Sequence, residues 1–385
     1  MMDGNLLDSL AFALALACAL FALSSGAPAE TAFPDAAWEE RSPASMGLDE
    51  GKLHAAVEYL RANSGRDGVR ELVIIRSGVM IWRGDNVDHV HGVWSLTKSF
   101  TSTVLGLLSD DGKASLDTRA SAHLPEMTDA YPEVTLRHFT TMTSGYRAIG
   151  DEPQGAYLHG PSKTPFRPGP QPLFTPPGSR YAYWDSAMNQ FGHVLTCLAQ
   201  EPMADLFRRR IAEPIGMDPA KWDWGVLGEE DGVKINGGSG NAGKHVRICA
   251  RELARFGLLM LHRGNWRGRQ LLSPAWVDAA TSVQVPADLP LGHPESNIDG
   301  RGVYGFNWWC NALGADGKRR WPGVPVGAYA ASGYNNNDLF VIPEWDLVIV
   351  RLGLDESTDG PISTTVYAEF LRLLGEALPP GHPAG

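Results

Sequence analysis

The sequence predicts an α+β fold in which the two ends of the chain build one domain around an inserted, mostly helical region. Two observations lead to this prediction: strand-like runs lie near both ends of the chain, and helical patterns fill most of its middle. The domain is expected at residues 40–378, with its α/β part at about 40–112 and 300–378 and the helical insertion at about 113–299. We expect a cleft between these two parts.

The first part of this domain has the pattern helix, hairpin, helix. Apolar residues at helical spacing predict the first helix after Asp49 and Glu50. Residues 72–76 and 79–83 are β-rich runs joined by Ser77-Gly78, which predicts a hairpin. Apolar residues then mark one face of a second helix, which starts near residue 96 and ends at Gly112 (Phe100, Val104, Leu107 and Leu108).

The middle of the chain begins with a long segment that is rich in glycine and proline. Thirteen of the 29 residues from 150 to 178 are Gly or Pro, which predicts an ordered loop that covers a site. A second Gly-rich loop is expected at residues 228–243, at the rim of the cleft. Helical patterns follow the first loop and continue into the second half of the chain (186–198, 203–211 and 248–261).

Strands return near the C-terminus. Four runs are strand-like (303–309, 326–331, 339–342 and 347–352), and residues 343–346 form a turn between the last two. An amphipathic helix follows, with its apolar positions between residues 366 and 374. These strands are expected to join the first hairpin.

Composition and charge exclude several classes of protein. Hydrophobic residues make up 43% of the 385 residues and charged residues 20%, which is typical of a globular protein and excludes a disordered or polytopic membrane chain. The net charge of −11, which no run of Lys and Arg reverses locally, excludes the electrostatic footprint of a nucleic-acid binder. We therefore expect no nucleic-acid partner.

The N-terminus predicts export. Residues 10–23 are wholly apolar, too few to span a bilayer comfortably, and small residues follow up to Ala27-Pro28-Ala29. Residues 1–29 are therefore interpreted as a signal peptide, which implies a periplasmic or secreted protein with no stable membrane insertion after cleavage. An uncleaved membrane anchor is the alternative, because no Lys or Arg precedes the apolar run. Cys197, Cys249 and Cys310 would remain, and at most one disulfide can form among three cysteines.

The strongest chemical signal is Ser95-Leu96-Thr97-Lys98, at the start of the second predicted helix. Residues three apart lie on one helical face, with Cβ atoms about 5–6 Å apart, so the Lys98 amine can reach the Ser95 hydroxyl. Free N–H groups at a helix start also stabilise a developing negative charge. The motif alone is weak, because a capping serine beside a solvated lysine gives the same pattern.

Two further elements accompany this motif. Tyr183 precedes another predicted helix, and a tyrosine near a lysine ammonium has a stabilised phenolate, which would lower its pKa and make it a useful base. Tyr183 could equally be a core aromatic residue, and Asp185 an ordinary N-cap. Ser332, Gly333 and Tyr334 end a late strand, where glycine permits close backbone approach and N–H groups could complete an oxyanion hole. A plain strand-to-loop glycine is the simpler alternative there.

In this order, the three elements resemble the serine β-lactamase and penicillin-binding-protein superfamily. The sequence is most similar to the branch that holds class C β-lactamases, D-alanyl-D-alanine peptidases, family VIII carboxylesterases and 6-aminohexanoate-dimer hydrolases. Four further short motifs support the resemblance: residues 138–145, 213–217, 251–257 and 341–344. The resemblance as a whole covers roughly residues 40–378. It implies a β-lactamase/transpeptidase-like fold, with an antiparallel sheet flanked by helices from both termini.

The resemblance also implies a mechanism without a metal or cofactor. Ser95 would be the nucleophile that forms an acyl-enzyme, and Lys98 and Tyr183 would share the general base and acid roles. The N–H groups of Ser95 and Tyr334 would form the oxyanion hole. Water would then release the acid.

This chain departs from the branch at two positions. Asp185 stands where the branch often has Asn, and a carboxylate beside Lys98 would hold the lysine charged, which favours Tyr183 as the base unless Asp185 points elsewhere. Ala331-Ser332-Gly333 replaces Lys-Thr-Gly, so the cation that faces a substrate carboxylate is missing.

The missing cation favours small esters or amides over β-lactams and D-Ala-D-Ala peptides. An apolar part of the substrate would suit a pocket lined by tryptophans (Trp94, Trp184, and Trp308 or Trp309). A class C-like β-lactamase or D-Ala-D-Ala carboxypeptidase remains the alternative enzyme. A non-catalytic sensor with the penicillin-binding fold is the alternative from another class.

Three other signals are set aside. Residues 238–245 resemble a phosphate loop, but His245 replaces the Ser or Thr that holds magnesium. His89 and His91 could both face one side of a strand, but no third metal ligand is evident, so a surface pair is expected. The sequence contains no Gly-x-Ser-x-Gly, which excludes an α/β-hydrolase nucleophile elbow.

Overall fold

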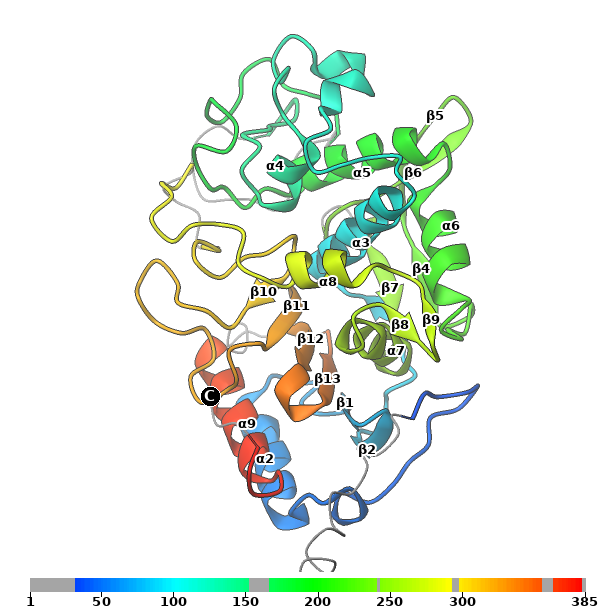
Figure 1. Cartoon of the computed structure of the whole chain (residues 1–385), viewed down its shortest axis with the longest axis vertical. Helices are drawn as coiled ribbons and strands as arrows, with labels where there is room; N and C mark the ends of the chain where they lie inside the picture. The colour runs from blue at the N-terminus through cyan, green and yellow to red at the C-terminus, as the bar shows by residue number, and fades with distance from the viewer. Residues whose placement is uncertain (1–31, 152–165, 241–242, 293–297, 355–362, 383–385) are drawn as a thin grey trace, which may run out of the picture. The chain divides into compact units, whose positions relative to one another are not determined.

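The central sheet of the computed structural model joins the two ends of the chain (Figure 1). Its six antiparallel strands run in the order β10-β11-β12-β13-β1-β2. At its centre β1 pairs with β13, from Glu71 opposite Leu352 to Arg76 opposite Leu347. The strands are β1 (Glu71–Arg76), β2 (Val79–Arg83), β10 (Trp309–Cys310), β11 (Tyr329–Gly333), β12 (Asn337–Ile342) and β13 (Leu347–Leu352). The predicted α+β fold with an antiparallel sheet is confirmed.

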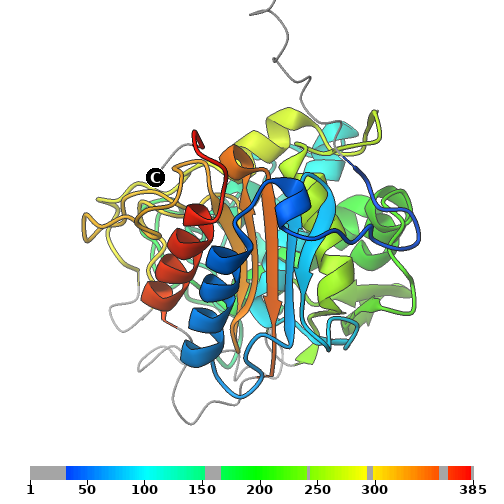
Figure 2. The same ribbon diagram turned by 90° about the horizontal axis from the view of Figure 1, so that it is seen from below.

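Helices cover both faces of this sheet. The terminal helices α2 (Glu50–Asn63) and α9 (Thr364–Glu376) lie against each other on one face, as Figure 2 shows from below. On the other face α7 (Ala250–Leu261) packs against β1, β12 and β13. Because both faces are covered, every residue of β1, β12 and β13 is buried, which explains the apolar stretches at 72–75, 339–342 and 347–350.

The remaining helices and several short strands lie between β2 and β10. The helices are α3 (Thr97–Asp110), α4 (Leu136–Thr140), α5 (Asp185–Ala199), α6 (Met203–Phe207) and α8 (Pro274–Ala280), with a π-helical turn at Arg208–Ala212. The strands are β3 (His91–Gly92), β4 (Trp222–Trp224), β5 (Val226–Glu230), β6 (Val233–Asn236), β7 (Val246–Ile248), β8 (Asn265–Trp266) and β9 (Arg269–Gln270). Short 3-10 turns occur at Ala44–Met46, Trp94–Leu96, Ala120–Ala122, Pro125–Met127 and Pro343–Trp345.

The helix that follows the Ser-x-x-Lys serine lies deep inside the molecule. The first twelve residues of α3 are all buried, the polar ones included, and α3 contacts α5, α6 and β11. The buried hydroxyls bond to backbone oxygens; for example, Ser99 Oγ donates to Asn307 O at 2.7 Å. This packing gives Lys98, near the start of α3, a fixed position.

Most predicted elements form, and the exceptions have local causes. Ser77 and Gly78 both adopt positive φ, as a two-residue hairpin turn requires. The strand predicted at 303–309 is wrong: only Trp309 and Cys310 are extended, because Asn307 adopts a left-handed conformation (φ 62°) that interrupts a strand. The helix predicted at 203–211 ends at Phe207 in the π-helical turn. The loop expected at 228–243 contains most of the exposed hairpin β5–β6.

The structure describes residues 32–151, 166–240, 243–292, 298–354 and 363–382. Residues from Phe33 onward form one compact unit. The predicted signal peptide lies outside the described residues, as does much of the predicted loop at 150–178. In the described part of the chain, no helix has the length and apolar character needed to cross a membrane. The three cysteines Cys197, Cys249 and Cys310 are free thiols.

Candidate active site

Ser95 lies in a strained turn between β3 and α3. The preceding residue, Trp94, adopts a left-handed conformation (φ 51°), which is costly for a bulky side chain and persists only where its surroundings hold it. The Trp94 indole stacks on His245 (ring centroids 5.0 Å apart) and meets Tyr334 edge-on (5.4 Å). Ser95 itself is half-buried, so its hydroxyl lies at the boundary between the core and solvent.

Lys98 is buried and bonds to two partners. Its Nζ lies 2.7 Å from Ser95 Oγ and 2.6 Å from Asp185 Oδ1. Lys98 is 1% exposed and Asp185 2%, so water does not screen this ion pair. The condition left open by the sequence is resolved: Asp185, in the first turn of α5, points at Lys98.

Ser239 is a member of this cluster that the sequence did not predict. Its hydroxyl donates to Asp185 Oδ1 at 2.5 Å, and its side chain is completely buried. It lies in the Gly-rich segment that resembles a phosphate loop. A Cβ on Gly238 would lie 2.0 Å from Met188 O, and one on Gly240 would lie 2.5 Å from Ser95 N. These glycines let the backbone at 238–240 pack directly against α5 and Ser95.

Tyr183 lies beside the lysine, as predicted, but its expected pKa shift is wrong. Its ring centroid is 4.5 Å from Lys98 Nζ, and its side chain hydrogen-bonds to Ser95. Burial raises the pKa of Tyr183 far above its usual value, and the negative charge of Asp185 raises it further. Since Asp185 balances the charge of Lys98, the ammonium does not favour the phenolate. Tyr183 is therefore a neutral phenol in the resting protein.

The end of β11 packs against the turn that carries Ser95. A Cβ on Gly333 would lie 2.0 Å from Val93 O and 3.1 Å from Leu96 N, so only glycine fits there. Ser332 pairs with Asp338 of β12, and Tyr334 follows in the turn with its side chain 58% exposed. The predicted residues Ser332, Gly333 and Tyr334 thus lie beside the nucleophile segment.

The tryptophans predicted to line a pocket have different surroundings. Trp308 is completely buried between Phe256 and Tyr329, so it belongs to the core and cannot line a pocket. The indole of Trp184 is buried and donates to Asp151 Oδ2 at 2.8 Å. Trp309 stacks on the Tyr183 ring, with centroids 6.3 Å apart. Trp94 alone among these four is half-buried.

Arg320 supplies a cation near Tyr183 and Trp309, a position that was not predicted from the sequence. Its guanidinium lies 4.1 Å from the centroid of the Trp309 ring, on which Tyr183 also stacks. Burial lowers the pKa of Arg320 to about 10, so the group stays charged at neutral pH. Its Nε is buried and finds no hydrogen-bond partner among the described residues. In the sequence, Lys318-Arg319-Arg320 gives no sign of this position, because it reads as a surface run.

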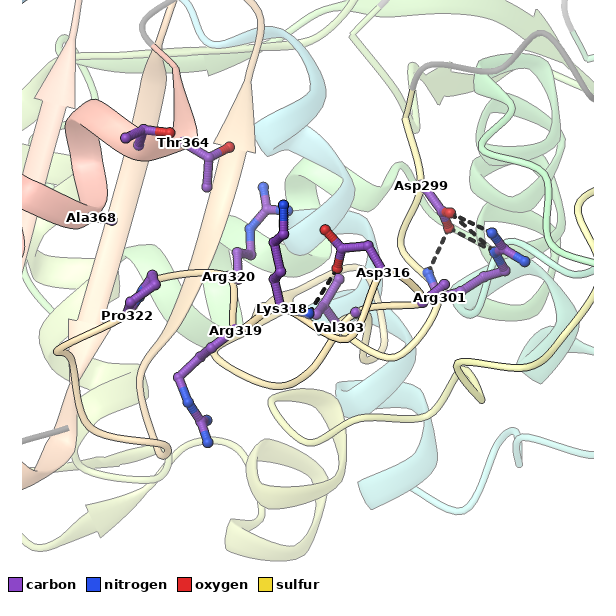
Figure 3. A pocket seen from close by; sticks show the side chains of 13 residues that line it. Asp299, Arg301, Val303, Asp316, Lys318, Arg319, Arg320, Pro322, Thr364 and Ala368 are labelled. Atoms are coloured by element: carbon purple, nitrogen blue, oxygen red, sulfur yellow. Dashed lines mark hydrogen bonds and ion pairs between the residues drawn. The ribbon is translucent and has the colours of Figure 1, made fainter.

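Two neighbouring cavities share Arg320 and Thr364. The smaller, of about 160 Å³, is also lined by Ser332 and Gly333 at the end of β11 and by Tyr334, which follows them. The larger, of about 790 Å³, is lined by further charged side chains and is drawn in Figure 3, where Lys318 and Arg320 point one way and Arg319 the opposite way. The Arg320 guanidinium therefore lines both cavities, and the smaller one begins at the end of β11.

The expectation of a surface pair without a third ligand at His89 and His91 is also wrong. Glu71 of β1 joins the two histidines, and the nearest ligand atoms of the three side chains all lie within 4.8 Å of one another. Periodicity could not reveal this, because Glu71 is 18 residues before His89 and occupies a buried strand position.

The arrangement can support nucleophilic catalysis. The hydroxyl of half-buried Ser95 contacts a buried amine and a neutral phenol, and the amine contacts a carboxylate. Such a cluster can remove a proton from a nucleophile and return it to a leaving group.

Comparison with known proteins places this geometry in a family. The family model described as Beta-lactamase matches residues 53–362. An uncharacterised protein of Alkalihalophilus pseudofirmus is 21% identical over 277 residues, 67% of this chain and 72% of that protein.

Solved structures share the fold at low identity. A putative 6-aminohexanoate-dimer hydrolase from Bacillus anthracis has a TM-score of 0.58 and 19% identity, over 80% of each chain. EstCE1, described as a hydrolase with promiscuous acyltransferase activity, has a TM-score of 0.61 and 18% identity, over 84% of this chain and 98% of its own. The match of the family model to well over half of the sequence decides the assignment: this chain belongs to the beta-lactamase family.

Proposed function

We propose that this protein is a serine hydrolase that cleaves small ester or amide bonds through an acyl-enzyme on Ser95. The observation that carries the proposal is the 2.7 Å hydrogen bond between the accessible Ser95 hydroxyl and the buried Lys98 amine. A capping serine beside a solvated lysine would not bury the amine or pair it with Asp185. Members of this superfamily are serine hydrolases, which supports the reaction class.

The proton of Ser95 needs an acceptor during the attack. Because Tyr183 is a neutral phenol, we assign acceptance to the Lys98–Asp185 pair: Nζ passes one proton to Asp185 along their 2.6 Å hydrogen bond and takes the Ser95 proton in exchange. Oγ then bonds to the substrate carbonyl carbon. Tyr183 donates its proton to the leaving oxygen or nitrogen as that bond breaks, and Asp185 returns its proton through Lys98 to Tyr183. Water then attacks the acyl-enzyme ester on Ser95. The proton transfers run in reverse: Tyr183 passes its proton through Lys98 to Asp185 and takes one from the water, and Lys98 returns a proton to Ser95 Oγ as the acid leaves.

The negative charge on the substrate oxygen needs stabilisation in this step. We assign it to the N–H groups of Ser95 and Tyr334, at the start of a helix and at the end of β11. The close approach of Gly333 to Val93 and Leu96 supports this assignment, because it holds the end of β11 against the serine turn.

The cavities favour a substrate that carries a negative charge away from the scissile bond. Arg320 lines the space beside Ser332 and Gly333 together with Asp338. Its buried Nε has no hydrogen-bond partner among the described residues, so a substrate carboxylate there could pair with the guanidinium. The likeness to a putative 6-aminohexanoate-dimer hydrolase supports amides with a free carboxylate. The likenesses to a family VIII carboxylesterase and to EstCE1 support esters.

Arg320 also supports the alternative function, a class C-like β-lactamase or D-Ala-D-Ala carboxypeptidase. The absence of the Lys-Thr-Gly lysine argues against β-lactams and D-Ala-D-Ala peptides only if no other cation can bind the substrate carboxylate. Arg320 could take that role from its position near the end of β11. Nitrocefin and a D-Ala-D-Ala peptide therefore belong in the substrate panel beside neutral esters and carboxylated amides.

The test is hydrolysis of a short-chain p-nitrophenyl ester by purified variants. Ser95→Ala should abolish turnover, and Lys98→Ala and Tyr183→Phe should each lower kcat/KM by several orders of magnitude, since residues that act as a unit fail together. Arg320→Gln should lower kcat/KM for carboxylated substrates at least tenfold and leave the neutral ester within threefold. Turnover by Ser95→Ala at the wild-type rate would contradict the proposal, and inactivity of the wild type on the whole panel would favour the sensor.

A further inference from the structure

Three side chains outside the active site form a compact cluster with metal-ligand chemistry. His91 Nε2 lies 2.7 Å from Glu71 Oε2, and His89 Nδ1 lies 2.9 Å from Glu71 Oε1. Glu71 begins β1, whereas both histidines lie beyond β2, in the segment that enters β3. The fold thus brings one carboxylate and two imidazoles together from two segments.

The burial of these groups resembles that of a protein-held cation site. Glu71 is 3% exposed and His91 5%, so two ligands are fixed by packing. The His89 side chain is 44% exposed, which leaves a path from solvent and freedom to adjust. Asn86 Nδ2 donates to Glu71 Oε1 at 3.0 Å and orients the carboxylate.

The hydrogen bonds of His91 fix the direction of its ring. Its Nδ1 lies 3.0 Å from Gly92 O, and a carbonyl can only accept, so Nδ1 carries a proton and donates it. A metal-bound histidine commonly has this arrangement, with its other ring N–H donating to a backbone carbonyl. The Nε2 atom hydrogen-bonds to Glu71 Oε2 at 2.7 Å, and a divalent cation bound here would replace the proton between these two atoms.

We propose that Glu71, His89 and His91 form a site for a divalent transition-metal ion, with Zn²⁺ as its best match. Two imidazoles and one carboxylate make a three-ligand set, and water completes a tetrahedron. Zinc binds such nitrogen and oxygen atoms at about 2.0–2.2 Å, which separates neighbouring ligand atoms by about 3.3 Å. The two carboxylate–imidazole separations, 2.7 and 2.9 Å, need only lengthen slightly to reach this value, and all three ligand atoms lie within 4.8 Å of one another.

The site would connect the central sheet to the nucleophile segment. His91 pairs with Ile248 in the small sheet and lies four residues before Ser95. Glu71, the first residue of β1, pairs with Leu352, the last residue of β13. A bound ion would therefore tether the central sheet to the strand that leads into the strained Trp94–Ser95 turn, which makes it a structural site that is independent of the proposed hydrolysis.

The experiment is calorimetric titration of the tag-free, EDTA-dialysed protein with ZnCl₂, together with thermal unfolding. We expect one Zn²⁺ per chain and a Tm that rises with Zn²⁺ concentration. Glu71→Gln and His89→Asn should each raise the Kd at least tenfold and reduce the Tm shift. His54→Asn is the matched control, because His54 is an exposed histidine next to Glu58 on α2; its titration should match the wild type.

Cobalt gives an independent readout. Co²⁺ bound to this site should show the visible d–d bands of a low-coordinate nitrogen and oxygen site without thiolate charge-transfer bands, which would distinguish it from binding at Cys197, Cys249 or Cys310. Because His89 is exposed, His89→Asn should fold even if Glu71→Gln does not. The proposal is overturned if no Zn²⁺ binds, or if binding to folded His89→Asn equals binding to the wild type.

Discussion

At the scale of single residues, the proposed chemistry depends on ionisable groups whose pKa values are shifted by burial. Tyr183 stays neutral because it is buried beside a balanced ion pair, and Arg320 stays charged although burial lowers its pKa. Asp338 is a third case next to the oxyanion strand. Burial raises its pKa to about 6, although hydrogen bonds with Ser332 and Tyr367 and the charge of Arg351 act in the opposite direction.

Asp338 predicts a specific dependence of stability on pH. Its folded pKa of about 6 exceeds its ordinary value of 3.8, so between these pH values the folded state binds a proton that the unfolded state does not. Stability from this group is therefore full below about pH 4 and is lost as pH rises through 6. Asp338→Asn removes the loss, so the variant should gain stability relative to the wild type between pH 4 and 7, by at most about 3 kcal/mol.

Urea unfolding at a series of pH values measures this difference. Asp231→Asn is the control, since Asp231 is exposed in the Asp-Gly turn between β5 and β6, and asparagine adopts the same left-handed backbone. Its curve should run parallel to that of the wild type. Parallel curves for Asp338→Asn as well would show that Asp338 does not titrate in this range.

At the scale of elements, the site depends on contacts that only glycine permits. Gly333 of β11 lies against the backbone of Val93 and Leu96, and Gly240 lies against that of Ser95. These two contacts hold the nucleophile turn between the oxyanion strand and the segment that carries Ser239. Small errors in such positions are costly in catalysis.

Gly333→Ala tests the contact between β11 and the serine turn. Its Cβ would lie 2.0 Å from Val93 O, so strand and turn must separate, and kcat/KM for the ester should fall at least a hundredfold. Gly51→Ala in α2 is the control: position 51 is exposed, and the nearest atom to its Cβ would be Asp49 Oδ1 at 3.3 Å, so activity and Tm should stay close to the wild type. Wild-type kcat/KM in Gly333→Ala would show that β11 does not constrain the nucleophile.

The element scale also shows what the sequence could predict. The hairpin at Ser77-Gly78 and the Ser95–Lys98 contact follow from local spacing, so both were predictable. The strand expected at 303–309 does not form because Asn307 adopts a left-handed conformation that interrupts it. Asparagine tolerates this conformation but does not require it, so the sequence could not predict the break. Ser239, Arg320 and Glu71 were missed because each reaches its cluster through tertiary contacts from a segment whose local pattern reads as loop, surface run or strand.

At the scale of the whole molecule, the fold places the site between segments that are distant in sequence. Ser95 and Lys98 follow the first hairpin, Tyr183 and Asp185 begin α5, and the strand that ends at Gly333 belongs to the central sheet. The sheet itself exists only when β13 pairs with β1 and the terminal helices pack together. The C-terminal helix should therefore be essential for stability.

Leu371→Ala tests the contribution of α9. This side chain is fully buried in the core, so truncation should lower the free energy of unfolding by about 2–5 kcal/mol. Leu373→Ala, at a partly buried position on the same helix, is the matched control and should cost clearly less. Equal, small losses for both variants in urea unfolding would mean that α9 is not part of the cooperative core.

The most direct test of the central claim is covalent labelling with a fluorophosphonate, read by intact mass and peptide mapping. The account predicts one adduct per chain on Ser95, its loss in Ser95→Ala, and strongly slowed labelling in Lys98→Ala. No adduct on the wild-type protein, or an adduct on a serine other than Ser95, would contradict the account.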